Sequence, residues 1–133
     1  MKQLFVWAVV GAILLDFILI FTPYTWLYFY DKDVLDAFGW NGFNSKLGDG
    51  QMLRYLLFAA YGIVSIGLIF FKRWARTGFV LVTILTIGLA SFWGVSVQYG
   101  YESAIGMVIG LLDGAILAMM NLTNLSNEFE RAS

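Results

Sequence analysis

The chain has 133 residues, of which 60% are hydrophobic, 18% are aromatic and only 13% are charged. Soluble domains carry roughly 25% charged residues, so a mean hydropathy of +0.77 in so short a chain indicates a polytopic membrane protein. The formal net charge of -1 argues against nucleic acid as a partner. The chain has no cysteine and no histidine, which excludes disulfides and thiolate chemistry and removes the commonest general base and metal ligand. We therefore expect no cofactor, no metal site and no catalytic residues.

Four apolar segments are long enough to cross a bilayer, which takes about 20 residues. They lie near residues 4–22, 51–71, 78–99 and 103–121. We predict an all-α integral membrane protein, with residues 1–133 folded as a single bundle of four transmembrane helices. The first segment contains Asp16 and ends without a small-residue cleavage site, so we interpret it as a retained span and not as a signal peptide.

The positions of lysine and arginine predict the orientation of the bundle in the membrane. The turn after the second span carries Lys72, Arg73 and Arg76, and four spans place Lys2 and Arg131 on the same side. We expect this basic side and both termini in the cytoplasm, where the turn can also contact anionic lipid. The compact loops and the absence of organelle signals favour a bacterial inner membrane.

The outer loop, residues 23–50, is the only sizeable segment expected outside the membrane, and aromatic residues at its start favour the headgroup layer. Asp33 can cap a short helix that Gly39 ends. We expect this helix to be amphipathic and to rest on the outer surface of the membrane. Its apolar residues are Val34, Leu35 and Phe38, followed by Trp40. At the other end of the chain, the short polar tail from Asn127 onwards is expected to fray.

Asp16, Arg54 and Asp113 are the ionisable residues expected at membrane depth. A carboxylate there is costly and needs a partner, a proton or water. Asp16 either binds a proton or cation in a transporter or is a structural acid paired with Arg54. Arg54 either reaches down to Asp16 or extends outward to headgroups and loop aspartates.

Asp113 has no cation at its own depth in the sequence. It is either a proton-binding acid or an interhelical tie. Candidate partners on other spans are Ser65, Thr83, Thr86 and Ser91. Glu102 lies at the outer boundary, where we expect it to be solvated.

Small residues recur every four positions in the fourth span. They form a stripe made of Gly106, Gly110, Gly114 and Ala118. The third span carries a similar small or polar line, made of Thr86, Ala90, Gly94 and Gln98. Small-residue faces let helix backbones approach closely in lipid, so we expect these two spans to dock on each other. A homodimer contact through the same stripe is the competing interpretation.

Two short stretches resemble one known family. GAILLD at residues 11–16 is similar to the first-span motif of small multidrug-resistance transporters, with Asp16 in place of their glutamate. AIGM at residues 104–107, with Gly114 and Asn121, resembles their last span. The resemblance implies a four-span transporter with an essential acid in its first span. That family has a short first loop and no counterpart of Arg54 or Asp113, so we do not assign the chain to it.

Two functions remain open from the sequence. The leading prediction is a small non-catalytic accessory or assembly subunit, which binds another membrane protein or a second copy of itself through small-residue helix faces. The alternative is a small proton-coupled transporter or channel subunit that uses Asp113 and Asp16.

Overall fold

The computed structural model describes residues 1–38, 50–92 and 98–131, and these residues form helices and connections without a strand. The elements in chain order are α1 (Lys2–Phe21), the 3-10 helix η1 (Thr22–Thr25), α2 (Trp26–Phe29), α3 (Lys32–Phe38), α4 (Gly50–Ile69), α5 (Arg73–Ala90), α6 (Gly100–Leu122) and α7 (Ser126–Arg131). By length and composition, four helices can cross a membrane: Lys2–Phe29, Met52–Ile69, Arg73–Ala90 and Gly100–Leu122. The prediction of an all-helical chain with four helices long and apolar enough to span a membrane is therefore confirmed, and these helices suggest a multi-pass membrane protein.

The helix bounds differ most from the prediction at α5. This helix begins at Arg73 and ends at Ala90, so Arg73 and Arg76 belong to the helix and not to the turn before it. The predicted short helix in the outer loop is present as α3, Lys32–Phe38. Gly94 and Trp40 lie outside the described residues.

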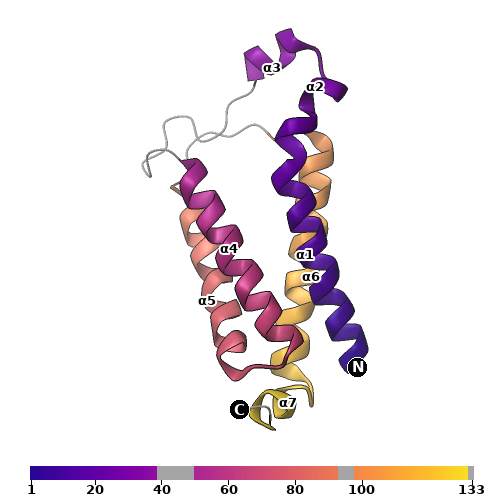
Figure 1. Ribbon diagram of the computed structural model, residues 1–133, viewed down its shortest axis with the longest axis vertical. Helices are drawn as coiled ribbons and strands as arrows, with labels where there is room; N and C mark the ends of the chain where they lie inside the picture. The colour runs from indigo at the N-terminus through magenta and orange to yellow at the C-terminus, as the bar shows by residue number, and fades with distance from the viewer. Residues whose placement is uncertain (39–49, 93–97, 132–133) are drawn as a thin grey trace.

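The long helices form two pairs, α1 with α6 and α4 with α5, and the pairs meet mainly through α1 and α4 (Figure 1). The start of α1, the turn between α4 and α5, and α7 lie at one end of the bundle (Figure 1). We call it the basic end, because it carries Lys2, Lys72, Arg73 and Arg76. The segments α2 and α3 lie at the opposite end (Figure 1).

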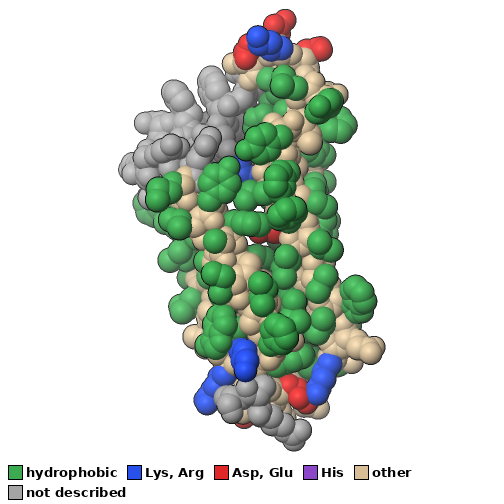
Figure 2. Space-filling model, viewed as in Figure 1, with side chains coloured by type: hydrophobic (Ala, Val, Ile, Leu, Met, Phe, Trp, Pro, Cys, Tyr) green, Lys and Arg blue, Asp and Glu red, His purple; other side chains and the backbone are tan. Residues whose placement is uncertain are grey.

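The surface is typical of a membrane protein. Figure 2 shows hydrophobic side chains over the long middle part of the molecule, with most charged side chains at its two ends. Large apolar residues stand fully outward from this band, such as Trp7 (72% exposed), Leu111 (75%) and Leu122 (84%). Such exposure would be unfavourable in water over so large a surface, and it is expected where lipid covers the helices.

The buried core is concentrated toward the basic end. It joins Phe5 and Val9 of α1, Leu68 of α4, Phe79 of α5 and Met120 of α6. The α4–α5 pair is especially close at one point. A Cβ atom added at Gly67 would lie 2.7 Å from the Cβ atom of Ala75, so only glycine fits there.

The predicted docking of the third span on the glycine stripe is wrong. Within the described residues, a Cβ atom added at Gly106, Gly110 or Gly114 would meet no atom within 4 Å. The helix α6 packs on α1 instead, through a different face that buries Ile116 and Met120. These large side chains offer more contact area than the glycines, which are left exposed together with Ala118.

The polar tail is also ordered, contrary to the prediction. Residues Ser126–Arg131 form α7. Leu125, just before it, is 3% exposed, and Phe129 within it is fully buried. This end of the chain therefore folds back on the basic end because Leu125 and Phe129 join the core.

Candidate functional site

A cavity of about 710 Å³ lies between the two helix pairs, on the side of the core away from the basic end. Figure 2 shows a hollow between the helices, with acidic atoms visible inside it. We call it the intramembrane cavity. The polar side chains that line it are Asp16, Arg54, Tyr61, Thr83, Thr86, Gln98, Glu102 and Asp113. The three ionisable residues predicted at membrane depth are thus brought together around one space.

Asp113 is tied to the opposite helix pair through Tyr61. The Tyr61 hydroxyl of α4 donates a hydrogen bond to Asp113 Oδ1 of α6 at 2.6 Å. This length is typical of a hydroxyl bonded to a carboxylate, which is stronger than a bond between neutral groups. The Tyr61 ring also packs on Phe79 of α5, with ring centroids 5.7 Å apart. Tyr61 is therefore the residue through which α4 and α5 hold the acid of α6.

The predicted hydroxyl partners of Asp113 are occupied differently. The hydroxyls of Thr83 and Thr86 donate to carbonyls one turn earlier in α5, both at 2.8 Å. Ser65 is fully buried one turn from Tyr61, and its hydroxyl has no hydrogen-bond partner among the described residues. The hydroxyl that bonds to Asp113 belongs to Tyr61, a residue that the sequence prediction did not name.

Asp16 and Arg54 face the same cavity without forming an ion pair within the described residues. Asp16 is half-buried and interacts electrostatically with both Asp113 and Arg54. Arg54 Nη2 donates to the backbone carbonyl of Leu19 at 3.2 Å, which joins α4 to α1. In this arrangement Arg54 compensates part of the negative charge in the cavity while its hydrogen bond goes to the backbone.

The arrangement of Asp16, Asp113 and Arg54 can bind a proton or a small cation. Two carboxylates that face one partly desolvated space repel each other, and a single guanidinium cannot neutralise both. A proton on either carboxylate, or a cation between them, relieves this repulsion. Within the described residues no group of three or more acidic residues is gathered that could hold a metal ion.

Glu102 is buried and not solvated as predicted, with 9% of its surface exposed. Trp26 Nε1 donates to Glu102 Oε1 at 2.7 Å, and the Tyr99 backbone N–H donates to Glu102 Oε2 at 3.4 Å. Glu102 is the third residue of α6, a position from which an acid commonly bonds back to the start of its helix. An acid at the third position of a helix can be recognised in the sequence. The Trp26 contact cannot, because it depends on how α2 folds against α6.

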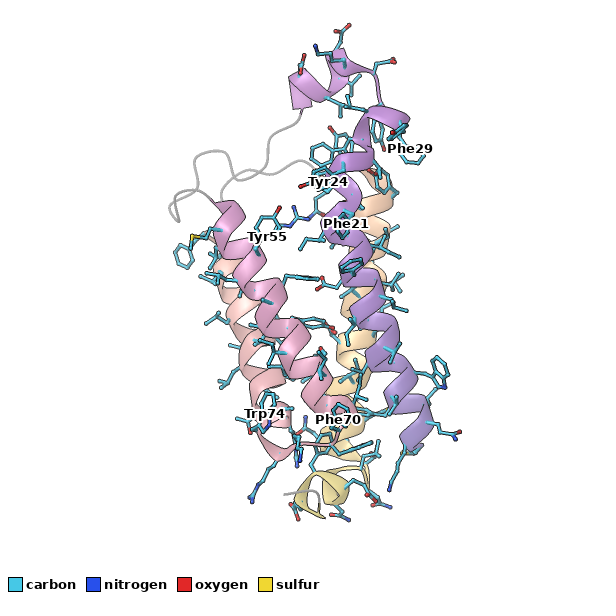
Figure 3. The ribbon with its side chains drawn as sticks, in the orientation of Figure 1. Phe21, Tyr24, Phe29, Tyr55, Phe70 and Trp74 are labelled. Atoms are coloured by element: carbon cyan, nitrogen blue, oxygen red, sulfur yellow. The ribbon has the colours of Figure 1, made fainter. Side chains whose placement is uncertain are left out.

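Aromatic rings close the end of the bundle away from the basic end. Tyr30 stacks on Tyr99 at 4.4 Å, and Trp26 meets Tyr99 edge-on at 4.9 Å. Tyr101 contacts Phe29 at 5.6 Å. These rings fix α2 on the start of α6. Figure 3 shows Phe21 of α1 and Tyr55 of α4 on facing sides of the space between the pairs.

The remaining predicted residues lie at the two ends of the molecule. Arg76 donates through Nε and Nη2 to Asn121 Oδ1 at 3.2 and 3.0 Å, which ties α5 to α6. Lys72 and Arg73 are exposed at the basic end. In α3, Val34 is 39% exposed and Leu35 is half-buried, and Phe38 is the last residue of the helix.

Comparison with known proteins finds no match: no family model fits the sequence, and no curated protein or solved structure is similar to it.

Proposed function

We propose that the protein is a small proton-coupled transporter or channel subunit, in which Asp113 and Asp16 exchange a proton in the intramembrane cavity. The observation that carries the proposal is the convergence of Asp16, Tyr61 and Asp113, from three different helices, on one cavity between the helix pairs. Acidic residues at membrane depth are expensive and commonly mark proton or ion pathways.

The Tyr61–Asp113 hydrogen bond provides a way to couple proton binding to helix movement. It links the α1/α6 pair to the α4/α5 pair at the level of the cavity, as the Arg54–Leu19 bond also does, and it is made by the titratable acid itself. When Asp113 is ionised, the bond is charge-assisted. When Asp113 takes up a proton, the bond becomes one between neutral groups, which is about half as strong. Proton uptake therefore loosens the two pairs at the cavity, and proton release tightens them again.

We place the basic end in the cytoplasm of a bacterial cell, with both termini on that side of the inner membrane. Lys72 and Arg73 are exposed at this end, as the excess of positive charge on cytoplasmic loops requires. The segment α3 then lies on the outer surface, where Val34 and Leu35 can contact the headgroup layer.

The proposal is tested by proton movement in vesicles that contain the purified protein, with a trapped pH-sensitive dye and an imposed pH gradient. Wild-type protein should dissipate the gradient faster than protein-free vesicles, and Asp113→Asn should abolish the difference while far-UV circular dichroism stays unchanged. Asp36→Asn is the matched control, because Asp36 is an exposed acid on α3. Equal proton movement by wild-type protein and Asp113→Asn would exclude Asp113 from this role.

A second candidate function, the accessory subunit, is favoured by the exposed stripe at Gly106, Gly110, Gly114 and Ala118. Gly110 and Gly114 also line the intramembrane cavity, so the variant is made at Gly106, which is not among the lining residues. Within the described residues nothing lies within 4 Å of a Cβ atom at Gly106, so Gly106→Leu should leave the bundle folded and disturb only a contact with another chain. The control is Leu111→Phe, on a lipid-facing residue that is 75% exposed.

The accessory function predicts a co-purifying membrane protein, or a cross-linked second copy, that Gly106→Leu removes and both Leu111→Phe and Asp113→Asn retain. Association that is insensitive to Gly106→Leu would exclude the stripe as the binding surface.

A further inference from the structure

The C-terminal helix α7 connects parts of the bundle that are distant in sequence. Its Phe129 is fully buried, with ring centroids 6.0 Å from Phe5 and 5.3 Å from Phe71. Lys2 Nζ lies 2.8 Å from Glu128 Oε2. The helix continues from α6, yet it contacts the start of α1 and the turn between α4 and α5. It therefore touches both helix pairs at the basic end.

The α7 contacts complete a closed core between the intramembrane cavity and the basic end. Asp16 of α1 and Tyr61 of α4 are the lining residues closest to the basic end on their helices. Beyond them, Leu68 and Phe5 are fully buried, and Phe129 packs directly on Phe5. The cavity is thus separated from the basic end by apolar side chains, the outermost of which belongs to α7.

The attachment of α7 relies on the burial of apolar side chains. A helix of six residues is not stable alone in water, so packing must hold it. The Lys2–Glu128 ion pair is partly exposed, with the two side chains 58% and 27% accessible, and exposed pairs contribute little. Burial of Phe129, together with Leu125 at the base of the helix, therefore contributes strongly to the attachment.

The backbone is strained at Phe71, one of the two residues on which Phe129 packs. Phe71 has φ of 53°, in the left-handed region that aromatic residues rarely adopt. It ends α4 in a position usually taken by glycine, where its N–H bonds to the Leu68 carbonyl and the Lys72 N–H bonds to the Gly67 carbonyl. Ring contacts with Phe5 and Phe129 are what make phenylalanine favourable there. Withdrawal of Phe129 removes part of that support, so the turn can rearrange when α7 leaves.

We propose that α7 is a gate at the basic end, which holds the core between that end and the intramembrane cavity closed while Phe129 is seated between Phe5 and Phe71. When Phe129 withdraws, the turn at Phe71 and the core residues behind it, such as Leu68 and Met120, rearrange and open the route to the cavity. The gate is a property of the fold beyond the proposed proton exchange. In the transporter it would provide the opening on the basic side that the closed core lacks.

The test is the accessibility of one buried position to a thiol reagent. The chain has no cysteine, so Ser65→Cys introduces a single thiol with little change in volume, at a fully buried site of α4. The purified full-length protein is reconstituted in vesicles and treated with a membrane-impermeant maleimide. Asn124→Cys, at an exposed position next to α7, identifies the vesicles whose basic end faces the reagent.

Ser65→Cys should be labelled slowly in the otherwise unchanged chain. Adding Phe129→Ala should raise the initial rate about a hundredfold with reagent on the basic side, because truncation of a fully buried phenylalanine shifts an opening equilibrium by that order. Phe129→Leu retains most of the apolar volume and should give a smaller rise. The matched control is Leu122→Ala, on a residue that is 84% exposed, and it should change nothing.

Unchanged labelling in both Phe129 variants would overturn the gate. So would an equal rise with reagent on the opposite side, or with Leu122→Ala, since either result means general loosening of the bundle. If Phe129→Ala does not fold, Phe129→Leu alone decides between these outcomes. The measurement uses no solute and no proton gradient, so the gate can fail while the proposed proton exchange stands, and the reverse also holds.

Discussion

Tyr61→Phe is the perturbation that most directly examines the link between the two helix pairs. It removes one hydroxyl and leaves the ring contact with Phe79 in place. The lost interaction is the 2.6 Å bond to Asp113, and hydrogen bonds to charged groups contribute about 1.5–3 kcal/mol. We expect the free energy of unfolding to fall by an amount in this range. For a chain of this size the corresponding fall in Tm is about 4 °C per kcal/mol.

The assay is thermal unfolding in detergent, followed by far-UV circular dichroism. The control is Tyr55→Phe, which removes a hydroxyl from a residue of the same helix that is 51% exposed, and its effect should stay within about 0.5 kcal/mol. Combining Tyr61→Phe with Asp113→Asn should cost less than the sum of the two single changes, because residues in contact are coupled. Additive effects, or equal effects of the two tyrosine variants, would refute the proposed link.

Two further predictions concern the packing around the site. Trp26→Phe should cost about 1.5–3 kcal/mol in thermal unfolding, because it removes the 2.7 Å bond to the buried Glu102, whereas Trp7→Phe on the exposed face of α1 should cost almost nothing. Gly67→Ala should destabilise by about 1–3 kcal/mol, since the new methyl would lie 2.7 and 2.9 Å from side-chain atoms of α5. Gly62→Ala, in open space on the same helix, should instead stabilise by up to about 1 kcal/mol, and a Gly67→Ala protein as stable as Gly62→Ala would contradict the close α4–α5 contact.

The sequence predicted the features that depend on local hydropathy. The four spans, the short helix at Lys32–Phe38 and the gathering of charges at the ends follow from composition along the chain. Asp16, Arg54 and Asp113 stood out because a charge in an apolar segment is costly wherever the helix points. Their common cavity could not be derived in the same way, since it depends on the order of helices in the bundle.

Helix order was not predictable, because lipid-facing and core-facing positions are equally apolar in a membrane protein. The small-residue stripe on α6 suggested a contact with α5, the helix that precedes it in the sequence. In the structure α6 packs on α1 instead, through large side chains such as Ile116. Tyr61 was missed because an aromatic residue in an apolar span does not distinguish a hydrogen-bonding role from simple packing. The burial of Phe129 was not predicted, because a polar six-residue segment with one aromatic ring is typical of a frayed end. Only the fold shows that Phe5 and Phe71 pack against this ring.

The most direct test of the central claim is infrared spectroscopy of the purified protein during a pH titration. We expect a carbonyl band of a protonated carboxylic acid that changes with pH and is removed by Asp113→Asn or altered by Asp16→Asn, because the two acids share one cavity. Asp36→Asn should leave this band unchanged. If no such band appears in the wild-type protein, or if it survives in the Asp113→Asn/Asp16→Asn double variant, the cavity does not exchange a proton and the account is contradicted.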